Sequence, residues 1–268
     1  MKKILCPTDF SNTAQNGIAY AAKLAKVING ELTLLHVHSL LEFAPAESGK
    51  DLASITQQLE SQSDEINRTF HVPCDSVVES TFRQLSTVIH DLSDQYDLVI
   101  MGSNGPDNIY QFLTGTNAYN AAVTSKVPVL IVPEEYVYSE IRKIVYAFDY
   151  LKERKLPLKE LAAFASALKC EITVLEVMEE VESKGAEEDL REMQLIMQNL
   201  YSRELPLKYE TLKSSDIALT INRYISNEQP DVLAICSLHM NVLQRLFHKS
   251  VIKNIAATSD YPVFVFHA

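Results

Sequence analysis

The chain carries the same pattern of segments twice, and this repetition limits the folds available to it more than any other feature. Four segments of the first half recur in the second half in the same order, the first two at an offset of 140 residues and the last two at 134. The pairs are KKILCPTDF (2–10) with RKIVYAFDY (142–150), NGELTLLHV (29–37) with KCEITVLEV (169–177), DLVIMGSNG (97–105) with DVLAICSLH (231–239), and VPVLIVP (127–133) with YPVFVFH (261–267). Matches that keep their order indicate two copies of one domain. We therefore expect domains at residues 1–138 and 139–268.

Each copy alternates strand-like and helix-like segments. In the first copy, KILCPTD is a short apolar run typical of a strand buried on both faces. The helix after it is predicted to be capped by Ser11 or Asn12 and to end at Asn29-Gly30. An amphipathic helix is expected at about 51–70, followed by a strand VPCDSVVE whose proline suits a sheet edge. Alternation of this kind predicts an α/β fold, an open five-stranded parallel sheet with helices on both faces.

The composition excludes several classes of protein. The formal net charge is −11, which argues against a surface for nucleic acid or anionic membrane. The apolar run after the two N-terminal lysines stops at Asp9, too early for a signal peptide, and no apolar run is long enough to span a membrane. The four cysteines are far apart and form no CxxC pair, so reduced thiols and a cytoplasmic location are expected.

Three of the seven glycines, Gly102, Gly105 and Gly115, lie in one segment, MGSNGPDNIYQFLTGTN (101–117). This segment follows a predicted strand and precedes a predicted helix, at the edge of an α/β sheet where ligands bind. Glycine-rich turns expose backbone N–H groups, and a helix N-terminus adds partial positive charge. The segment therefore predicts an anion site suited to phosphate, although it contains neither a P-loop nor a GxGxxG fingerprint.

The glycine spacing, together with the flanking ILCPTDFS and SKVPVLIVP, resembles the ATP-binding signature of the universal stress proteins. The resemblance extends over both copies. It implies two Rossmann-like domains of the adenine nucleotide alpha hydrolase type, each with strand order 3-2-1-4-5. It also implies that the first domain binds ATP with Mg²⁺. The residues it implies are Pro7, Thr8 and Asp9 beside the adenosine, Val37 at the adenine, Met101 and Gly102 beside the ribose, and Gly105, Gly115, Thr116 and Asn117 at the phosphates.

Two departures from the family pattern modify this expectation. Family members often carry a basic residue between the first glycines, whereas no lysine or arginine occurs here between Arg83 and Lys126. We therefore expect weaker affinity for ATP, or a less charged ligand such as AMP. In the second copy Cys236, His239 and Lys249 stand where the glycines would be. The second domain is accordingly expected to keep the fold without this site.

Simpler interpretations exist for several of these residues. Gly102 and Gly105 would also serve as turn residues, and Asp9 would also cap a helix or close a turn. His36 and His38 lack a third convergent ligand, so they are interpreted as core or surface histidines rather than a metal site. Cys236 and His239 as a nucleophilic pair would need an orienting acid, and none is evident.

These observations support an ATP-binding stress or signalling protein that acts through conformation and protein partners. No catalytic residue is assigned, because no general base or basic clamp lies near the glycine segment, and at most slow ATP hydrolysis is expected. One alternative is a nucleotide-free dimerisation scaffold. Its last strands, VLIV and VFVF, would pair between chains as a homodimer or between the two copies. Another alternative is a small-metabolite binding protein or enzyme that uses the same crevice.

Overall fold

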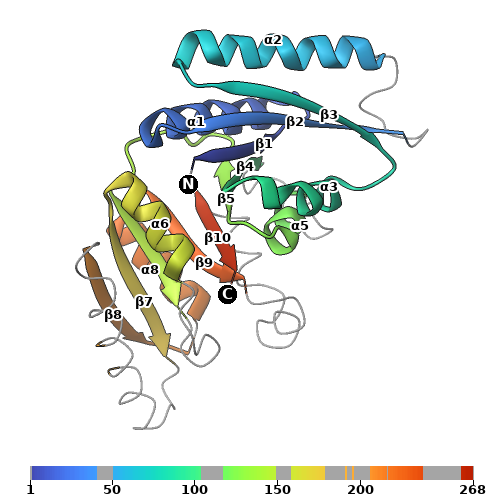
Figure 1. Cartoon of the computed structure of the whole chain (residues 1–268). Helices are drawn as coiled ribbons and strands as arrows, with labels where there is room; N and C mark the ends of the chain where they lie inside the picture. Colours follow the sequence, from blue (N-terminus) through green and yellow to red (C-terminus); the bar gives the residue numbers. More distant parts are fainter. Residues whose placement is uncertain are drawn as a thin grey trace. The chain divides into compact units, whose positions relative to one another are not determined.

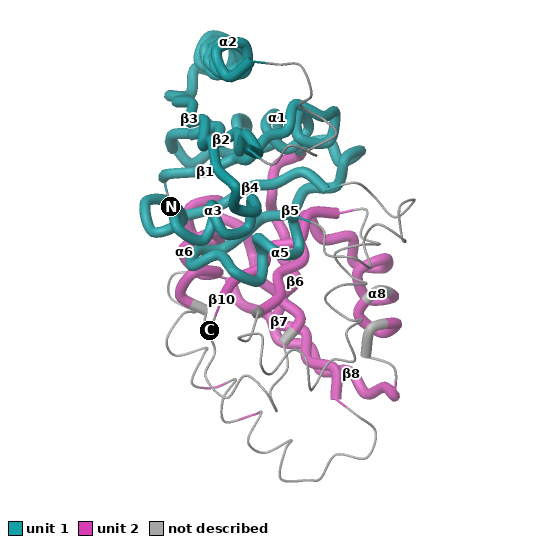
Figure 2. The backbone as a smooth tube through the Cα atoms, turned by 90° about the vertical axis from the view of Figure 1, so that its right-hand side faces the viewer, with its two compact units in different colours: residues 1–138, 257–260 teal, residues 139–256, 261–268 magenta. Residues whose placement is uncertain are grey.

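The chain folds into two compact units, which Figure 2 shows in different colours. Unit 1 contains residues 1–138 with 257–260, and unit 2 contains residues 139–256 with 261–268. The computed structural model describes residues 2–40, 51–103, 117–148, 158–178, 191, 195, 206–215, 217–237 and 261–267.

Unit 1 is built on five parallel strands. They are β1 (Lys3–Pro7), β2 (Glu31–Ser39), β3 (Cys74–Thr81), β4 (Leu98–Ser103) and β5 (Val129–Pro133). Their order across the sheet is β3-β2-β1-β4-β5, and each neighbouring pair is parallel. The apolar residues of β1, β4 and β5 are almost wholly buried, as expected for strands covered on both faces. This arrangement confirms the predicted order 3-2-1-4-5.

Four helices among the described residues cover the sheet of unit 1. They are α1 (Asn12–Ile28), α2 (Leu52–Phe70), α3 (Leu85–Leu92) and α5 (Asn117–Thr124), with a short 3₁₀ turn η1 at Ser93–Gln95. The helices α1 and α2 contact each other, as do α3 and α5, and right-handed crossovers place the two pairs on opposite faces (Figure 1). The Ser11 hydroxyl caps α1 by accepting the Ala14 N–H, and Asn29 ends the helix in the left-handed conformation with φ 51°.

One strand boundary differs from its prediction. The segment VPCDSVVE at 72–79 was expected to form the third strand with its proline inside. The strand instead begins at Cys74, and Pro73 lies just before it. The Pro73 carbonyl accepts the Leu32 N–H at 2.9 Å, a contact that needs no N–H from the proline. The strand does form the edge of the unit 1 sheet, as predicted.

Unit 2 repeats the same plan. Its strands are β6 (Lys143–Phe148), β7 (Glu171–Met178), β8 (Leu207–Lys213), β9 (Val232–Ser237) and β10 (Val263–His267), and its described helices are α6 (Leu158–Leu168) and α8 (Ile217–Glu228). Within this unit the order is β8-β7-β6-β9-β10, again all parallel and again 3-2-1-4-5. In neither unit does a described helix combine the length and low polarity that crossing a bilayer requires.

The repetition extends to individual hydrogen bonds. The Lys2 carbonyl accepts the Glu31 N–H at 2.7 Å, and the Arg142 carbonyl accepts the Glu171 N–H at 2.9 Å. Lys169 ends α6 in the left-handed conformation with φ 56°, matching the end of α1. Each of these bonds lies at the amino-terminal edge of its sheet, and together they confirm the alignment of the two halves.

An aspartate anchors the first strand in each unit. In unit 1 the Asp97 carboxylate accepts the backbone N–H groups of Lys2 and Lys3 at 2.7 and 3.0 Å. In unit 2 the Asp231 carboxylate accepts those of Arg142 and Lys143 at 2.8 and 2.9 Å. A carboxylate that accepts two N–H groups is a strong acceptor, so both aspartates stabilise the start of the sheet.

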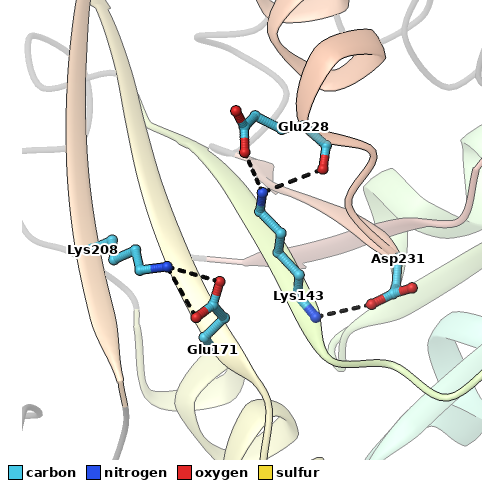
Figure 3. A network of polar contacts seen from close by, with 5 residues as sticks. All are labelled: Lys143, Glu171, Lys208, Glu228 and Asp231. Atoms are coloured by element: carbon cyan, nitrogen blue, oxygen red, sulfur yellow. Dashed lines mark hydrogen bonds and ion pairs between the residues drawn. The ribbon is translucent and has the colours of Figure 1, made fainter.

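The anchor of unit 2 belongs to a larger network of charges (Figure 3). The Lys143 ammonium pairs with the Glu228 carboxylate and also donates to the Glu228 carbonyl at 3.3 Å. Beside this pair, the Lys208 ammonium contacts both carboxylate oxygens of Glu171 at 3.1 Å. The Lys143 pair lowers the pKa of Glu228. Because all four side chains keep part of their surface in solvent, the ion pairs themselves contribute little to stability.

We expect Asp97→Ala to lower the free energy of unfolding by about 1–2 kcal/mol at neutral pH, because two N–H groups lose a charged acceptor. Partial burial alone would raise the pKa of Asp97, but the N–H groups of Lys2 and Lys3 and nearby positive charge outweigh it and lower the pKa. The stabilisation by the Asp97 carboxylate is therefore fully present above the ordinary carboxyl pKa of the unfolded chain. It is lost as the pH falls through the lowered pKa of Asp97 in the folded protein. Urea unfolding between pH 7 and pH 2 measures it.

The matched control is Asp94→Ala, which removes an exposed carboxylate paired with Lys126 at 2.5 Å. Its effect should stay below about 0.5 kcal/mol. An Asp97→Ala protein whose stability deficit is as large at pH 2 as at pH 7 would show that the anchoring charge is unimportant.

All four cysteines, Cys6, Cys74, Cys170 and Cys236, are buried. Burial raises the pKa of Cys74 and of Cys170 to about 12, and it also raises the pKa of Cys6. Thiols with such pKa values are not ionised near neutral pH, so these three are structural rather than nucleophilic.

Candidate functional site

The predicted residues Pro7, Thr8, Asp9, Val37, Met101 and Gly102 lie at or near the carboxyl ends of β1, β2 and β4. The connection from β1 leads to β2 on one side, and the connection from β3 returns to β4 on the other side of β1. The strand order therefore reverses between β1 and β4, the position at which open α/β sheets bind ligands. Pro7, Thr8 and Asp9 lie at the end of β1, and Met101 and Gly102 lie in the neighbouring β4.

The turn after β1 is held by a series of short-range hydrogen bonds. The Thr8 hydroxyl accepts the Phe10 N–H at 3.0 Å, and the Asp9 carboxylate accepts the Ser11 N–H at 3.0 Å. Thr8 is buried whereas Asp9 is exposed. The Asp9 side chain thus closes the turn and Ser11 caps the helix, which leaves the exposed side of the Asp9 carboxylate facing solvent at the sheet edge.

His36 connects this turn to β2, a role that sequence reasoning missed. The ring is 3% exposed, and its Nδ1 lies 2.8 Å from the Thr8 carbonyl oxygen. Because a carbonyl only accepts hydrogen bonds, Nδ1 carries the proton. The ring also stacks on Phe10, with centroids 4.8 Å apart and planes 30° apart. The available signal in the sequence was a histidine placed within the apolar run of a buried strand.

Val37 lies just beyond the point where β1 stops. The two strands pair as far as Pro7 opposite Leu35, and the Thr8 N–H donates to the Leu35 carbonyl at 2.8 Å. Peptide groups along a strand point alternately to its two sides, so those of Val37 point the same way as those of Leu35. They face the space beyond the end of β1, where one N–H donor and one C=O acceptor are presented to the crevice.

Gly102 has a packing role that differs from both interpretations offered by the sequence. A Cβ at this position would lie 2.1 Å from the Thr13 carbonyl oxygen, and a Cβ at Gly17 would lie 2.7 Å from the Gly102 nitrogen. The two glycines therefore let the first turns of α1 lie directly against β4. Met101, the preceding residue, is buried. Close helix–strand contact accounts for Gly102 before any ligand is considered.

The remaining predicted residues are described only in part. Asn117 is the exposed first residue of α5. Gly105, Gly115 and Thr116 lie outside the described residues. In unit 2, Cys236 occupies the position that corresponds to Gly102 and is buried near the end of β9, whereas His239 and Lys249 lie outside the described part of the chain.

Two units of the same parallel strand order, each with a switch point between its first and fourth strands, define a tandem α/β protein. The universal stress protein family model matches residues 1–133 and again residues 140–267. The chain therefore belongs to the universal stress protein family and carries two of its domains in tandem.

Individual relatives agree with this assignment. A universal stress protein from Methanocaldococcus jannaschii is 26% identical over 152 residues, which cover 49% of this chain and 94% of that protein. The crystal structure of a universal stress protein from Archaeoglobus fulgidus has a TM-score of 0.76 at 17% identity and covers 99% of this chain and 98% of its own. A putative universal stress protein from Pseudomonas aeruginosa has a TM-score of 0.62 at 14% identity, with coverage of 100% and 93%. These two structures show the same fold along the whole chain.

Proposed function

We propose that unit 1 binds an adenine nucleotide, ATP or AMP, in the crevice at the ends of β1, β2 and β4. The observation that carries the proposal is the Val37 peptide, which presents a donor and an acceptor beyond the last paired residue of β1. The edge of adenine offers the complementary pair, the N6 amino donor and the N1 acceptor. This peptide faces the end of β1, on the side of β1 away from β4, and the strand order reverses between β1 and β4, where the glycine-rich segment follows.

Each predicted residue has a proposed role in the bound complex. Thr8 and Asp9 would border the adenosine, with the buried Pro7 supporting them, and Val37 would pair with adenine. Met101 and Gly102 would form the wall beside the ribose. Gly105, Gly115, Thr116 and Asn117 would contact the phosphates through backbone N–H groups and the start of α5. Mg²⁺ would accompany a triphosphate and neutralise part of its charge.

The charge distribution favours modest affinity. No lysine or arginine occurs between Arg83 and Lys126, so phosphate binding would depend on peptide N–H groups, helix N-termini and the metal ion. The same lack of a basic clamp argues against rapid phosphoryl transfer. Bound nucleotide would thus act as a signal that shifts conformation or partner binding, with hydrolysis slow at most.

Unit 2 is proposed to be nucleotide-free. Its counterpart of Gly102 is Cys236, so the close approach of helix and strand found in unit 1 would be blocked by a Cβ. Its counterpart of His36 is Glu176, a buried carboxylate. The glycines of the phosphate segment are also missing from this half.

Isothermal titration of the nucleotide-stripped full chain tests the proposal. ATP with Mg²⁺, and AMP in a separate titration, should each report one site per chain. Gly115→Val should abolish binding without lowering the melting temperature, because it removes the expected close approach of backbone to phosphate. The control is His239→Gly, which changes the corresponding segment of unit 2 and should leave affinity and stoichiometry unchanged.

Two results would contradict this assignment. Absence of heat and of any thermal shift with both nucleotides would favour the nucleotide-free scaffold. Loss of binding in His239→Gly together with retention in Gly115→Val would place the site in the second unit.

A further inference from the structure

We infer that His36 is a positioning residue that sets the base selectivity of the unit 1 crevice, an inference that rests on the proposed nucleotide binding. His36 lies one residue before Val37, the proposed partner of adenine, and it reaches across to the turn that follows β1. It thereby connects the two elements between which the base would lie.

The first part of the argument is the hydrogen bond to Thr8. The Thr8 carbonyl lies at a buried position and accepts from the His36 Nδ1 at 2.8 Å. Without this donor, a buried carbonyl would lose its partner, and the turn would move to find a replacement. The carboxylate of Asp9 is carried by the same turn and would move with it.

The second part is the conformation of Phe10. This residue has φ 64°, a left-handed conformation that non-glycine residues adopt only when their surroundings hold them there. The stack on His36 and the bond from the Phe10 N–H to the Thr8 hydroxyl both help to hold it. The imidazole ring therefore stabilises a strained turn at the mouth of the crevice, on the side where the base would bind.

The third part comes from the equivalent position in unit 2. His36 follows the Pro7–Leu35 pair of β1 and β2, and Glu176 follows the corresponding Ala147–Leu175 pair of β6 and β7. Both side chains are buried, with 3% and 5% exposed. Glutamate has no ring N–H, so Glu176 cannot hold a backbone carbonyl through an imidazole donor as His36 does. The unit that lost the glycine motif has thus also lost this donor.

The test compares the affinities of full-length variants for ATP, CTP and inorganic tripolyphosphate, each with Mg²⁺. His36→Phe keeps an aromatic ring but removes the donor. It should weaken ATP binding about tenfold, the scale of one buried hydrogen bond, while CTP and tripolyphosphate change less than about twofold. His36→Gln restores a donor and should recover about half of the lost ATP-over-CTP preference on a logarithmic scale.

The matched control is His90→Phe. The Nδ1 of His90 also bonds a backbone carbonyl, that of Thr124 at 2.7 Å, but it lies on α3 away from the carboxyl ends of β1 and β2. This variant should keep the wild-type ATP-over-CTP preference. Phe10→Gly gives a second measurement that leaves the His36 donor in place. By freeing the strained turn from its stack, it should reduce the preference by a smaller factor than His36→Phe does.

Retention of the full ATP-over-CTP preference by a folded His36→Phe or by Phe10→Gly would overturn the inference. Equal weakening of ATP, CTP and tripolyphosphate would also overturn it, because it would indicate general damage rather than base positioning. Absence of ATP binding in the wild-type chain would instead refute the proposed function, and the role of His36 would fail with it.

Discussion

Gly102→Ala should lower the free energy of unfolding of unit 1 by about 3 kcal/mol in the absence of nucleotide, because the added methyl group overpacks a close backbone contact. Its Cβ would lie 2.1 Å from the carbonyl oxygen and 2.8 Å from the carbonyl carbon of Thr13. Both are backbone atoms, so the clash with the added methyl group can be relieved only if α1 moves away from β4. Urea unfolding of the nucleotide-stripped protein measures the loss, and hydrogen exchange should report faster opening in α1.

Cys236→Ala is the control for this experiment. Cys236 occupies the strand position of unit 2 that corresponds to Gly102, and the alanine variant keeps the Cβ that this position already accommodates. The loss of the buried sulfur should lower the free energy of unfolding by only about 1 kcal/mol. Glycine-to-alanine changes at unstrained positions commonly stabilise a protein by about 0.4–1 kcal/mol. A gain of that kind in Gly102→Ala would show that helix and strand are farther apart than the structure indicates.

Phe164→Ala should lower the free energy of unfolding of unit 2 by about 4 kcal/mol, the usual cost of deleting a fully packed phenyl ring. Phe164 lies on α6 with 2% of its surface exposed, and it stacks on Phe264 of β10 with centroids 4.5 Å apart. The resulting cavity is lined by rings that cannot collapse fully into it. Differential scanning calorimetry with peptide-level hydrogen exchange would locate the loss in unit 2.

Leu219→Ala on α8 provides the comparison, because Leu219 is 45% exposed and its truncation should cost less than about 1 kcal/mol. Under the proposed division of labour, Phe164→Ala should bind ATP as the wild type does at temperatures where it remains folded. A Phe164→Ala protein with unchanged stability would mean that the ring is not part of a tightly packed core.

Local patterns were enough to predict the architecture. The first five residues of the predicted strand KILCPTD form β1, Ser11 caps α1, and Asn29 ends that helix as expected from its tolerance of the left-handed conformation. These features depend on residues within a few positions of each other. The strand order followed from the family resemblance, and the hydrogen-bonded pairs within each unit confirm it.

The details of the crevice depend on contacts between distant residues, which is why the sequence did not show them. His36 and Thr8 are 28 positions apart, and only the pairing of β1 with β2 brings the imidazole to the carbonyl. Gly102 was interpreted as a turn or ligand residue, because nothing local reveals that Gly17 and Thr13 would pack against it. The start of β3 also depends on a distant contact, because its pairing with β2 begins at Cys74 opposite Leu32.

The two aspartate anchors suggest how a duplicated gene of this kind can diverge. Asp97 and Asp231, with the matching bonds around them, remain the same at the amino-terminal edges of the two sheets. At the opposite edges the residues have changed, from His36 to Glu176 and from Gly102 to Cys236. The anchors therefore lie at the edge of each sheet opposite to the residues proposed for recognition. Because the anchor bonds involve only residues of the amino-terminal edge, the change to Cys236 and Glu176 at the other edge leaves these bonds in place.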